Sequence, residues 1–436
     1  MKDARSKVGP AGDAGIPEGL GLGSARPLAD WLRPMRVALA VARHGSTVRA
    51  SEAIHLSQSA VARAIGELEK ACGMPLFERG PRGMIPTPAG SRLAARVETM
   101  LHHLSSGASE AIVATPPEAR SPASPARFPA VVTPAELRAL VAIATLGSEA
   151  AAGASLGLTQ PAIHHALQGL EQLLGVRLFL RLSFGTRLTP AGEALLRRVK
   201  LTLAEVKAME VDLGAWRGEY RGRVVVGVLP LSVSIFLPRA VERLHASHPG
   251  IEVRIVDGTY ESLVQQLLCA EIDAIAGALR ADAPAADLRQ WPLFEDDLVV
   301  VARAGHPCLQ RQVHGLSDLM EWDWVTPLPG TPADRGLVRV FEGQGVPLPE
   351  RSLQASSPSL TLAFVMQTDR LALASCGQAM AESAAGGLRV VPVGLQATQR
   401  PIGLLTRAVG HPSPDLTLFV EACEAVVDRR HYAQQC

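Results

Sequence analysis

The spacing of apolar residues changes character near Arg223. Before this point apolar residues recur at helical intervals, most clearly over residues 193–218, where they form a stripe along one face. After it, the short apolar run Val224–Val228 and the alternating segment Ile251–Val256 predict strands. Strands that alternate with helical patterns predict a mainly parallel sheet. We therefore expect a helical front part and an α/β rear part.

The front part contains an internal repeat. Residues 45–90 recur without a gap 102 residues later as residues 147–192, and 18 of the 46 aligned positions are identical. The identical positions include a Gly-Ser pair, a Gln, a Leu-Glu pair, a Gly and a Thr-Pro-Ala-Gly run. A repeat of this kind predicts two copies of one folded unit.

Each copy has the pattern of two short helices followed by a β-hairpin. In the first copy Ser57 is placed to cap a helix over Gln58–Ala71, which a short helix over 48–54 and a tight turn precede. This order is typical of the helix-turn-helix, whose second helix enters the major groove of DNA by its N-terminal residues. The candidate DNA contacts are Ser57, Gln58, Ser59 and Arg63 on this helix, and Arg79 and Arg82 on the hairpin wing.

Gly73 and four motifs of the first copy strongly resemble the N-terminal domain of LysR-type transcriptional regulators. The motifs are Leu56–Val61, Leu68-Glu69, Leu76–Arg79 and Thr87–Gly90, and their counterparts 102 residues later resemble it too. The resemblance implies two winged helix-turn-helix domains, with double-stranded DNA as a partner. The candidate DNA contacts of the second copy are Thr159, Gln160, Pro161, His164, His165 and Arg181.

The two copies differ on the predicted recognition helix. Family members usually carry Ser-Arg there, whereas the first copy has Ala62-Arg63 and the second His164-His165. Arginine is a permanent cation and histidine is mostly neutral at pH 7, so we expect the second copy to contact phosphate less strongly. One copy is expected to serve base readout and the other spacing or oligomer geometry, and the sequence leaves open which is which.

The helix after the second copy occupies the place of the family's dimerising linker helix. Its apolar stripe over Ala191–Leu213 is long enough to need a partner surface, so we expect a dimer through this helix and tetramers through the rear domains.

The rear part carries a series of short motifs: Arg221-Gly222, Val226-Gly227-Val228, Leu237-Pro238, His248-Pro249, Asp257-Gly258, Glu271-Ile272-Asp273 and His306-Pro307. With these motifs it resembles the effector-binding domain of the same family, and the resemblance implies the two-lobed fold of type 2 periplasmic binding proteins. Residues 369–371, Asp-Arg-Leu, most resemble the galactose-binding-protein-regulator branch, whose effectors are expected to be sugars or aromatic or organic acids. Each candidate hydroxyl has an alternative role as a helix cap or turn residue, and the arginine either pairs with Asp369 or faces a ligand anion. The candidate effector contacts are Ser232, Ser234, Thr259, Thr331, Ser357 and Arg370.

Charge and motif content narrow the function further. The net charge is +7 over residues 28–223 and −7 over residues 224–436, which favours a polyanion as the partner of the front part only. No phosphate-binding Gly-rich loop, nucleophile elbow or His-Glu-x-x-His pair occurs, so we expect no enzyme, no catalytic residue, no metal and no cofactor. The six cysteines are widely separated and are expected to be reduced thiols.

The predicted fold is an α+β multidomain chain, with two winged helix-turn-helix domains followed by a two-lobed α/β domain. The expected segments are a flexible leader (1–27), the first DNA-binding domain (28–105), a Pro-rich linker (106–130), the second DNA-binding domain (131–192), a linker or dimerisation helix (193–218) and the effector-binding domain (219–430).

The predicted function is that of a ligand-responsive DNA-binding transcriptional regulator. A small metabolite bound between the two lobes would alter promoter binding. The alternative is an intracellular solute-binding or oligomerisation module whose DNA readers have decayed. We expect a cytoplasmic homodimer or homotetramer without a membrane partner, because no apolar stretch is long enough to span a bilayer.

Overall fold

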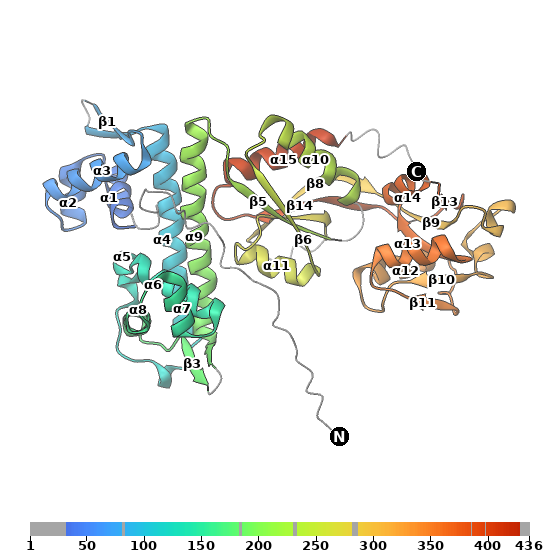
Figure 1. Ribbon diagram of the computed structural model, residues 1–436, viewed down its shortest axis with the longest axis horizontal. Coiled ribbons are helices and arrows are strands. Elements are labelled where there is room, and N and C mark those ends of the chain that lie inside the picture. Colours follow the sequence, from blue (N-terminus) through green and yellow to red (C-terminus); the bar gives the residue numbers. More distant parts are fainter. Residues whose placement is uncertain are drawn as a thin grey trace, which may run out of the picture. The chain divides into compact units, whose positions relative to one another are not determined.

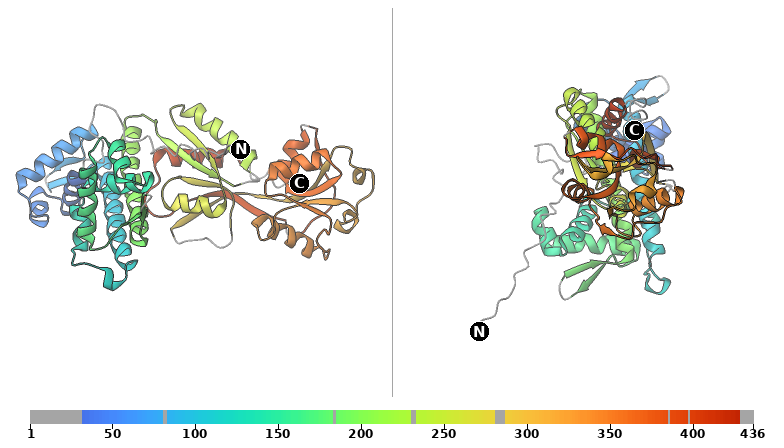
Figure 2. Two further views of the ribbon diagram at one scale, coloured as in Figure 1. Left: turned by 60° about the horizontal axis from the view of Figure 1, so that its bottom comes forward. Right: turned by 90° about the vertical axis from the view of Figure 1, so that its right-hand side faces the viewer.

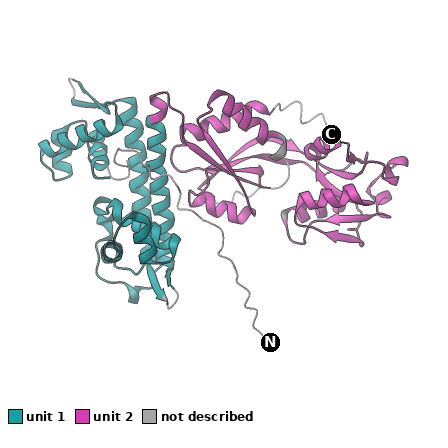
Figure 3. Ribbon diagram, in the orientation of Figure 1, with its two compact units in different colours: residues 1–213 teal, residues 214–436 magenta. Residues whose placement is uncertain are grey.

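The computed structural model describes residues 32–427 except 81–82, 183–184, 230–232, 281–286, 385 and 397. The chain divides into two compact units, with the boundary between Leu213 and Gly214 (Figure 3). The predicted change of character near Arg223 lies close to this boundary. The leader 1–27, Arg82 and Ser232 lie outside the described residues, and of Ser234 only its place in a helix is described.

Unit 1 contains both copies of the repeat, which we call reader 1 and reader 2. Reader 1 consists of α1 (Leu32–His44), α2 (Thr47–Ala53), α3 (Gln58–Cys72), β1 (Phe77–Gly80) and β2 (Gly83–Pro86). Reader 2 consists of α6 (Pro134–Leu146), α7 (Glu149–Leu156), α8 (Gln160–Leu174), β3 (Phe179–Leu182) and β4 (Gly185–Leu188). Each is followed by a long helix, α4 (Pro88–Val113) and α9 (Pro190–Trp216). Between them lie η2 (Pro117–Ala119), η3 (Pro125–Arg127) and α5 (Phe128–Val131).

The residues shared by the two copies hold the same local structure in both. A carboxylate oxygen of Glu69 accepts the backbone N–H of Leu76 at 2.8 Å, and Glu171 accepts that of Leu178 at the same distance. Each bond ties the end of the recognition helix to the start of the hairpin. The Leu-Glu and Leu-Phe motifs of the repeat are therefore explained by the fold itself.

Glycine is required at the start of both long helices. A Cβ atom on Gly90 would lie 1.9 Å from the carbonyl oxygen of Leu76, and one on Gly192 would lie 2.1 Å from that of Leu178. No side chain fits at such an approach. The Thr-Pro-Ala-Gly run thus lets α4 and α9 begin directly against the hairpins.

Helices α4 and α9 lie side by side and antiparallel (Figures 1 and 2). The stripe of α9 is buried in one continuous core with α4: Leu195, Val199, Val206, Met209 and Leu213 share that core with Leu93, Val97, Met100 and Leu104. This corrects the expected dimer through Ala191–Leu213, because a helix of the same chain covers that surface. Helix α4 also runs to Val113, so the segment predicted as a linker from residue 106 begins as helix.

Among the described residues no single helix is long and apolar enough to span a membrane. The segments Pro125–Val131 and Pro134–Leu146 reach that length and apolar content only together, and the chain bends by 106° between them. Leu137, Leu140 and Ile143 of α6 are buried in the core of unit 1.

Unit 2 has two lobes, each built on a five-stranded mixed sheet. The strand order is β6-β5-β7-β14-β8 in lobe 1 and β11-β10-β12-β9-β13 in lobe 2. Lobe 1 contains β5 (Arg223–Val228), α10 (Val233–Ser247), β6 (Glu252–Asp257), α11 (Tyr260–Leu268), β7 (Ala274–Ala278), β8 (Leu288–Asp296), β14 (Arg400–Arg407) and α15 (Pro414–Val426). Lobe 2 contains β9 (Leu298–Arg303), η4 (Pro307–Gln310), η5 (Leu316–Leu319), β10 (Asp323–Thr326), α12 (Pro332–Gly343), β11 (Ser352–Gln354), α13 (Pro358–Gln367), β12 (Arg370–Ser375), α14 (Cys376–Ala384) and β13 (Leu388–Val390).

The predicted strands at 224–228 and 251–256 are confirmed as β5 and β6, which pair in parallel. Strand β14 was not predicted, because Pro401 and Gly403 interrupt its apolar run. The strand nevertheless lies inside the sheet, with a bulge between Ile402 and Gly403. A Cβ on Gly403 would lie 2.1 Å from the carbonyl oxygen of Trp291, so this glycine permits a close approach of backbones.

Cys72, Cys269, Cys308 and Cys423 carry thiols, as expected. Cys376 instead takes part in a disulfide bond, which corrects the expectation of six reduced cysteines.

Candidate functional site

The recognition helix of reader 1 exposes its N-terminal turn. Ser57 caps α3, with its hydroxyl accepting the N–H of Ala60 at 3.2 Å, as the sequence predicts. Gln58, Ser59 and Arg63 are exposed. Their amide, hydroxyl and guanidinium groups are the types that pair with base edges in a major groove.

The wing of reader 1 adds a cation beside this helix. Arg79 lies on β1 and is exposed, and no described residue forms an ion pair with it. An exposed arginine with no protein counter-charge can contact phosphate directly.

Reader 2 presents a different set of side chains on the same scaffold. Thr159 caps α8 by accepting the N–H of Ala162, and Gln160, Pro161 and His165 are exposed. His164 is half-buried. The described candidate contacts of both readers therefore lie at the start of the recognition helix and on the wing, and all are exposed except His164.

His164 is half-buried because it packs into a small charged cluster that sequence reasoning missed. The carboxylate of Glu149, the first residue of α7, lies 2.9 Å from an Arg181 nitrogen and 3.2 Å from Nδ1 of His164. The same Arg181 nitrogen lies 2.9 Å from that imidazole nitrogen. We call these three residues the Glu149 cluster. The repeat carries the missed signal, because the position that is Glu149 in reader 2 is Thr47 in reader 1.

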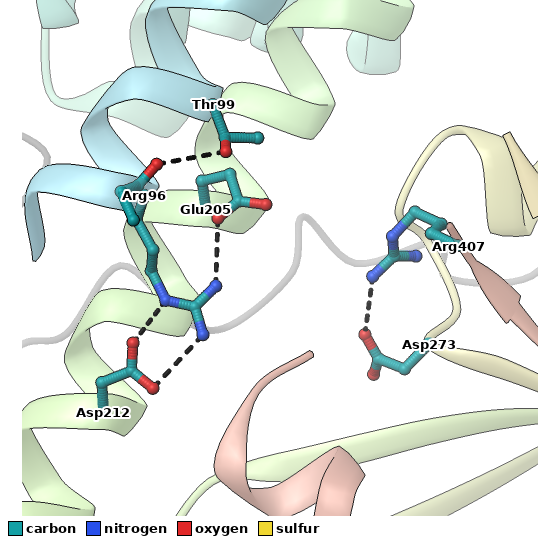
Figure 4. A network of polar contacts seen from close by, with 7 residues as sticks. Arg96, Thr99, Glu205, Asp212, Asp273 and Arg407 are labelled. Atoms are coloured by element: carbon teal, nitrogen blue, oxygen red, sulfur yellow. Dashed lines mark hydrogen bonds and ion pairs between the residues drawn. The ribbon is translucent and has the colours of Figure 1, made fainter. Parts of the chain in front are cut away.

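The long helices are joined by ion pairs at each end of their contact, one buried and one partly exposed. Arg96 of α4 is fully buried and binds Asp212 and Glu205 of α9, the latter at 3.0 Å (Figure 4). Burial by itself lowers the pKa of Arg96, but the hydrogen bonds and charges of the two carboxylates outweigh it and raise that pKa. The guanidinium is therefore permanently charged, and it fixes the register of the two helices.

At the other end, Glu110 of α4 binds Arg197 at 2.9 Å and Arg198 at 2.5 Å. Partial burial favours the neutral carboxyl, but the two arginines outweigh it and lower the pKa of Glu110. Gly107 permits the close contact here, because a Cβ on it would lie 2.8 Å from the Cβ of Arg198.

The described hydroxyl candidates for effector binding are divided between the lobes of unit 2, and each caps a helix. Thr259 caps α11 in lobe 1, and Thr331 and Ser357 cap α12 and α13 in lobe 2. The Thr331 hydroxyl also donates to the carbonyl of Leu328 at 2.8 Å, so both of its hydrogen-bonding roles are taken. Thr259 is exposed, and its hydroxyl proton has no described acceptor.

Arg370 does not pair with its neighbour Asp369, which was one of the two predicted arrangements. It lies at the start of β12, 3.4 Å from the carboxylate of Asp323, while Asp369 pairs with Arg303 at 2.6 Å. The neighbouring residues Asp369 and Arg370 thus belong to two separate ion pairs in lobe 2.

A small cavity of about 10 Å³ lies at the carboxyl ends of the parallel strands in lobe 1. Tyr260, Arg280 and Gln290 contribute its polar lining. The Arg280 guanidinium lies 3.3 Å from the centre of the Tyr260 ring and 3.2 Å from the carboxylate of Glu261. Burial raises the pKa of Tyr260, so its phenol is a neutral donor. These polar residues were not predicted, although the open ends of parallel strands are where ligands bind in such sheets.

Polar contacts also join the two lobes where the chain crosses between them. Asp296, buried at the end of β8, accepts the Ser375 hydroxyl of lobe 2 at 3.1 Å and binds Arg400 at 2.8 Å. Asp297 accepts the hydroxyl of Thr398 at 2.6 Å. Any change in the angle between the lobes acts on these contacts.

Two family models match the chain in three segments. The model of the bacterial regulatory helix-turn-helix protein, lysR family, matches residues 32–91 and again residues 134–193, and the LysR substrate binding domain matches residues 217–428. These segments cover more than half of the chain. The chain belongs to the LysR family. It is a ligand-responsive, DNA-binding transcriptional regulator, and the predicted duplication of its DNA-binding domain is confirmed by the double match.

Similar curated proteins are HTH-type transcriptional regulators. The HTH-type transcriptional regulator GalR of Pseudomonas putida is 33% identical over 91% of this chain and 97% of its own. That alignment leaves about 40 residues of this chain unmatched, fewer than either helix-turn-helix segment, so it extends into both readers. The HTH-type transcriptional regulator GbpR of Rhizobium radiobacter is 33% identical over 57% of this chain and 83% of its own.

Solved structures share the fold. A full-length OxyR variant from Pseudomonas aeruginosa has a TM-score of 0.55 at 21% identity, covering 68% of this LysR-family chain and 96% of that chain. ArgP from Mycobacterium tuberculosis has a TM-score of 0.54 at 18% identity, covering 67% of this chain and 96% of that chain.

Proposed function

We propose that one chain presents both readers to DNA as a single unit, with the α4–α9 pair in the place of a dimer interface. The observation that supports this proposal is a repeated ion pair. The repeat offset of 102 relates Arg96 to Arg198 and Glu110 to Asp212, so Arg96–Asp212 and Arg198–Glu110 are counterparts of each other. A contact in which residue i meets j, and the counterpart of i meets the counterpart of j, is characteristic of a two-fold interface.

A two-fold arrangement offers the two recognition helices, α3 and α8, to two half-sites on one duplex. The exposed residues of each helix differ, since Arg63 of reader 1 corresponds to His165 of reader 2. We therefore propose that one chain binds two unlike half-sites in a fixed order, with the candidate residues of each recognition helix contacting base edges and the wing arginines contacting phosphate.

We also propose that a small polar or anionic metabolite, such as a sugar or an organic acid, binds between the lobes at the carboxyl ends of the lobe 1 strands. Arg280 and Tyr260 line that edge, and Thr259 has a hydroxyl proton to donate. The cavity holds about one water molecule, so a metabolite needs the Arg280 side chain to leave the Tyr260 ring. The ligand changes DNA binding only as far as it prefers one lobe arrangement over another.

The chain is proposed to act in the cytoplasm as a homodimer or homotetramer. Because α4 covers the stripe of α9, self-association is assigned to unit 2 and not to the long helices.

The test is footprinting of the full chain on genomic DNA, with and without candidate metabolites, followed by native mass spectrometry on the shortest protected duplex. We expect two unlike half-sites bound by one chain, and a footprint that one metabolite alters. A shortest site that always needs two chains contradicts the single-chain unit. The absence of sequence-specific protection contradicts DNA reading altogether and favours a module with decayed readers.

A further inference from the structure

We propose that Glu149 restrains reader 2 by holding the wing cation Arg181 in an ion pair within the protein, so that this one carboxylate sets how phosphate binding is divided between the two readers. This inference rests on the proposed function, since it requires both readers to meet DNA. It identifies Glu149 as a positioning residue that acts through Arg181 and His164.

Glu149 is well placed for this role because it lies where three elements of reader 2 meet. It begins α7, while His164 is on the first turns of α8 and Arg181 is on β3. The Glu149 side chain is only 9% exposed, whereas that of Arg181 is 69% exposed. The carboxylate is thus fixed beneath a cation that faces solvent.

Reader 1 lacks every part of this cluster except the cation. The counterparts of Glu149, His164 and Arg181 are Thr47, Ala62 and Arg79. Thr47 accepts a hydrogen bond from the Gln58 amide at 3.4 Å, and no described residue forms an ion pair with Arg79. The same wing position therefore carries a cation without a described counter-charge in reader 1 and a neutralised one in reader 2.

This difference changes DNA affinity through counterions. An unpaired arginine that binds phosphate releases counterions from the duplex, and each such contact steepens the slope of log K against log salt by about 0.9. Arg181 must give up the Glu149 carboxylate to bind phosphate in the same way. We therefore expect Arg181 of reader 2 to add less to the salt dependence of DNA affinity than Arg79 of reader 1.

The experiment measures binding of the full chain to a random-sequence 40-base-pair duplex across a salt series, by fluorescence anisotropy. Glu149→Thr places the reader 1 residue in reader 2, and should steepen the slope by about 0.9 and tighten binding roughly fivefold at 0.15 M salt. The matched reverse exchange, Thr47→Glu, should flatten the slope and weaken binding by similar factors. Glu149→Gln keeps the side-chain size and should behave as Glu149→Thr does.

A double-mutant cycle assigns the effect to Arg181. Arg181→Gln should weaken binding less in the wild-type chain than in the Glu149→Thr chain, where it should abolish the gain. Thermal melting of each variant shows whether it folds. Unchanged or weakened DNA binding by folded Glu149→Thr and Glu149→Gln overturns the inference, and weakened binding would mean that Glu149 itself contacts DNA.

The two proposals fail in different ways. If the wild-type chain binds no DNA at low salt, DNA reading itself fails. If the wild-type chain binds and both Glu149 variants retain its salt slope, only the role of Glu149 fails.

Discussion

Reader 1 and reader 2 are one fold with two surfaces. The positions that are identical between them, such as Glu69 and Glu171 or Gly90 and Gly192, hold buried contacts that both copies make. Positions at which they differ include the exposed turns of the recognition helices and the residue that begins the helix before. Duplication within one chain therefore leaves the scaffold constrained while each surface is free to change.

The contact between α4 and α9 also combines matching positions with unlike surroundings. Its two ion pairs are counterparts, yet Arg96 is fully buried against two carboxylates, while the Arg198 side chain is 15% exposed and binds only Glu110 among the described acids. The counterpart of Glu205 is His103, which carries no negative charge for Arg198 to bind. One half of the contact is thus expected to be stronger than the other.

The largest expected effect comes from removing the buried arginine. Arg96→Met leaves Asp212 and Glu205 without their guanidinium in the core, and should destabilise unit 1 by about 3–5 kcal/mol. Arg198→Met should cost less, roughly 1–3 kcal/mol, because water reaches Glu110. Hydrogen exchange of α4 and α9 in the full chain measures both losses, with the exposed Arg92→Met as the control. Equal losses for the two arginines would remove the proposed difference between the halves.

The next effect separates the readers in DNA binding. Arg63→Ala should weaken binding to the selected operator by ~1–3 kcal/mol, because it removes a cation that can bind guanine or phosphate. His165→Ala, at the matching position of reader 2, should cost less at pH 8, where histidine is ordinarily neutral. Competition titrations with the operator duplex measure both. A larger loss from His165→Ala would make reader 2 the dominant reader.

The smallest effect concerns the turn before each recognition helix. His55 has a φ of +54°, and its counterpart Gly157 has a φ of +65°. Side chains are strained in this region, so Gly157→Ala should destabilise reader 2 by about 1 kcal/mol, although open space surrounds the added Cβ. His55→Gly should change reader 1 by less than about 1 kcal/mol, because relief of strain is offset by the greater freedom of glycine in the unfolded chain. Urea unfolding followed by hydrogen exchange measures both, and a loss of stability larger than this in His55→Gly would show that the imidazole makes a stabilising contact.

Local chemistry determined much of the protein from the sequence alone. Ser57 caps the recognition helix as expected, because capping needs only a hydroxyl next to the first free N–H groups. Strands such as β5 followed from runs of apolar residues, and the repeat itself fixed the number of readers. Pro401 and Gly403 concealed β14, since their tolerance in a central strand depends on a bulge and a close backbone approach that neighbouring strands provide.

Only the tertiary structure decided which residues and helices contact each other across long distances in the sequence. The periodicity of apolar residues predicted that one face of α9 is buried, because removing apolar side chains from water is favourable. The hydrophobic effect has no direction, so the periodicity does not show which surface covers that face. The partner proved to be α4 of the same chain, through contacts between residues more than 100 positions apart, such as Arg96 with Asp212. Glu149, His164 and Arg181 likewise look like separate surface residues in the sequence. Only the packing of α7, α8 and the wing brings these three side chains within about 3 Å of each other.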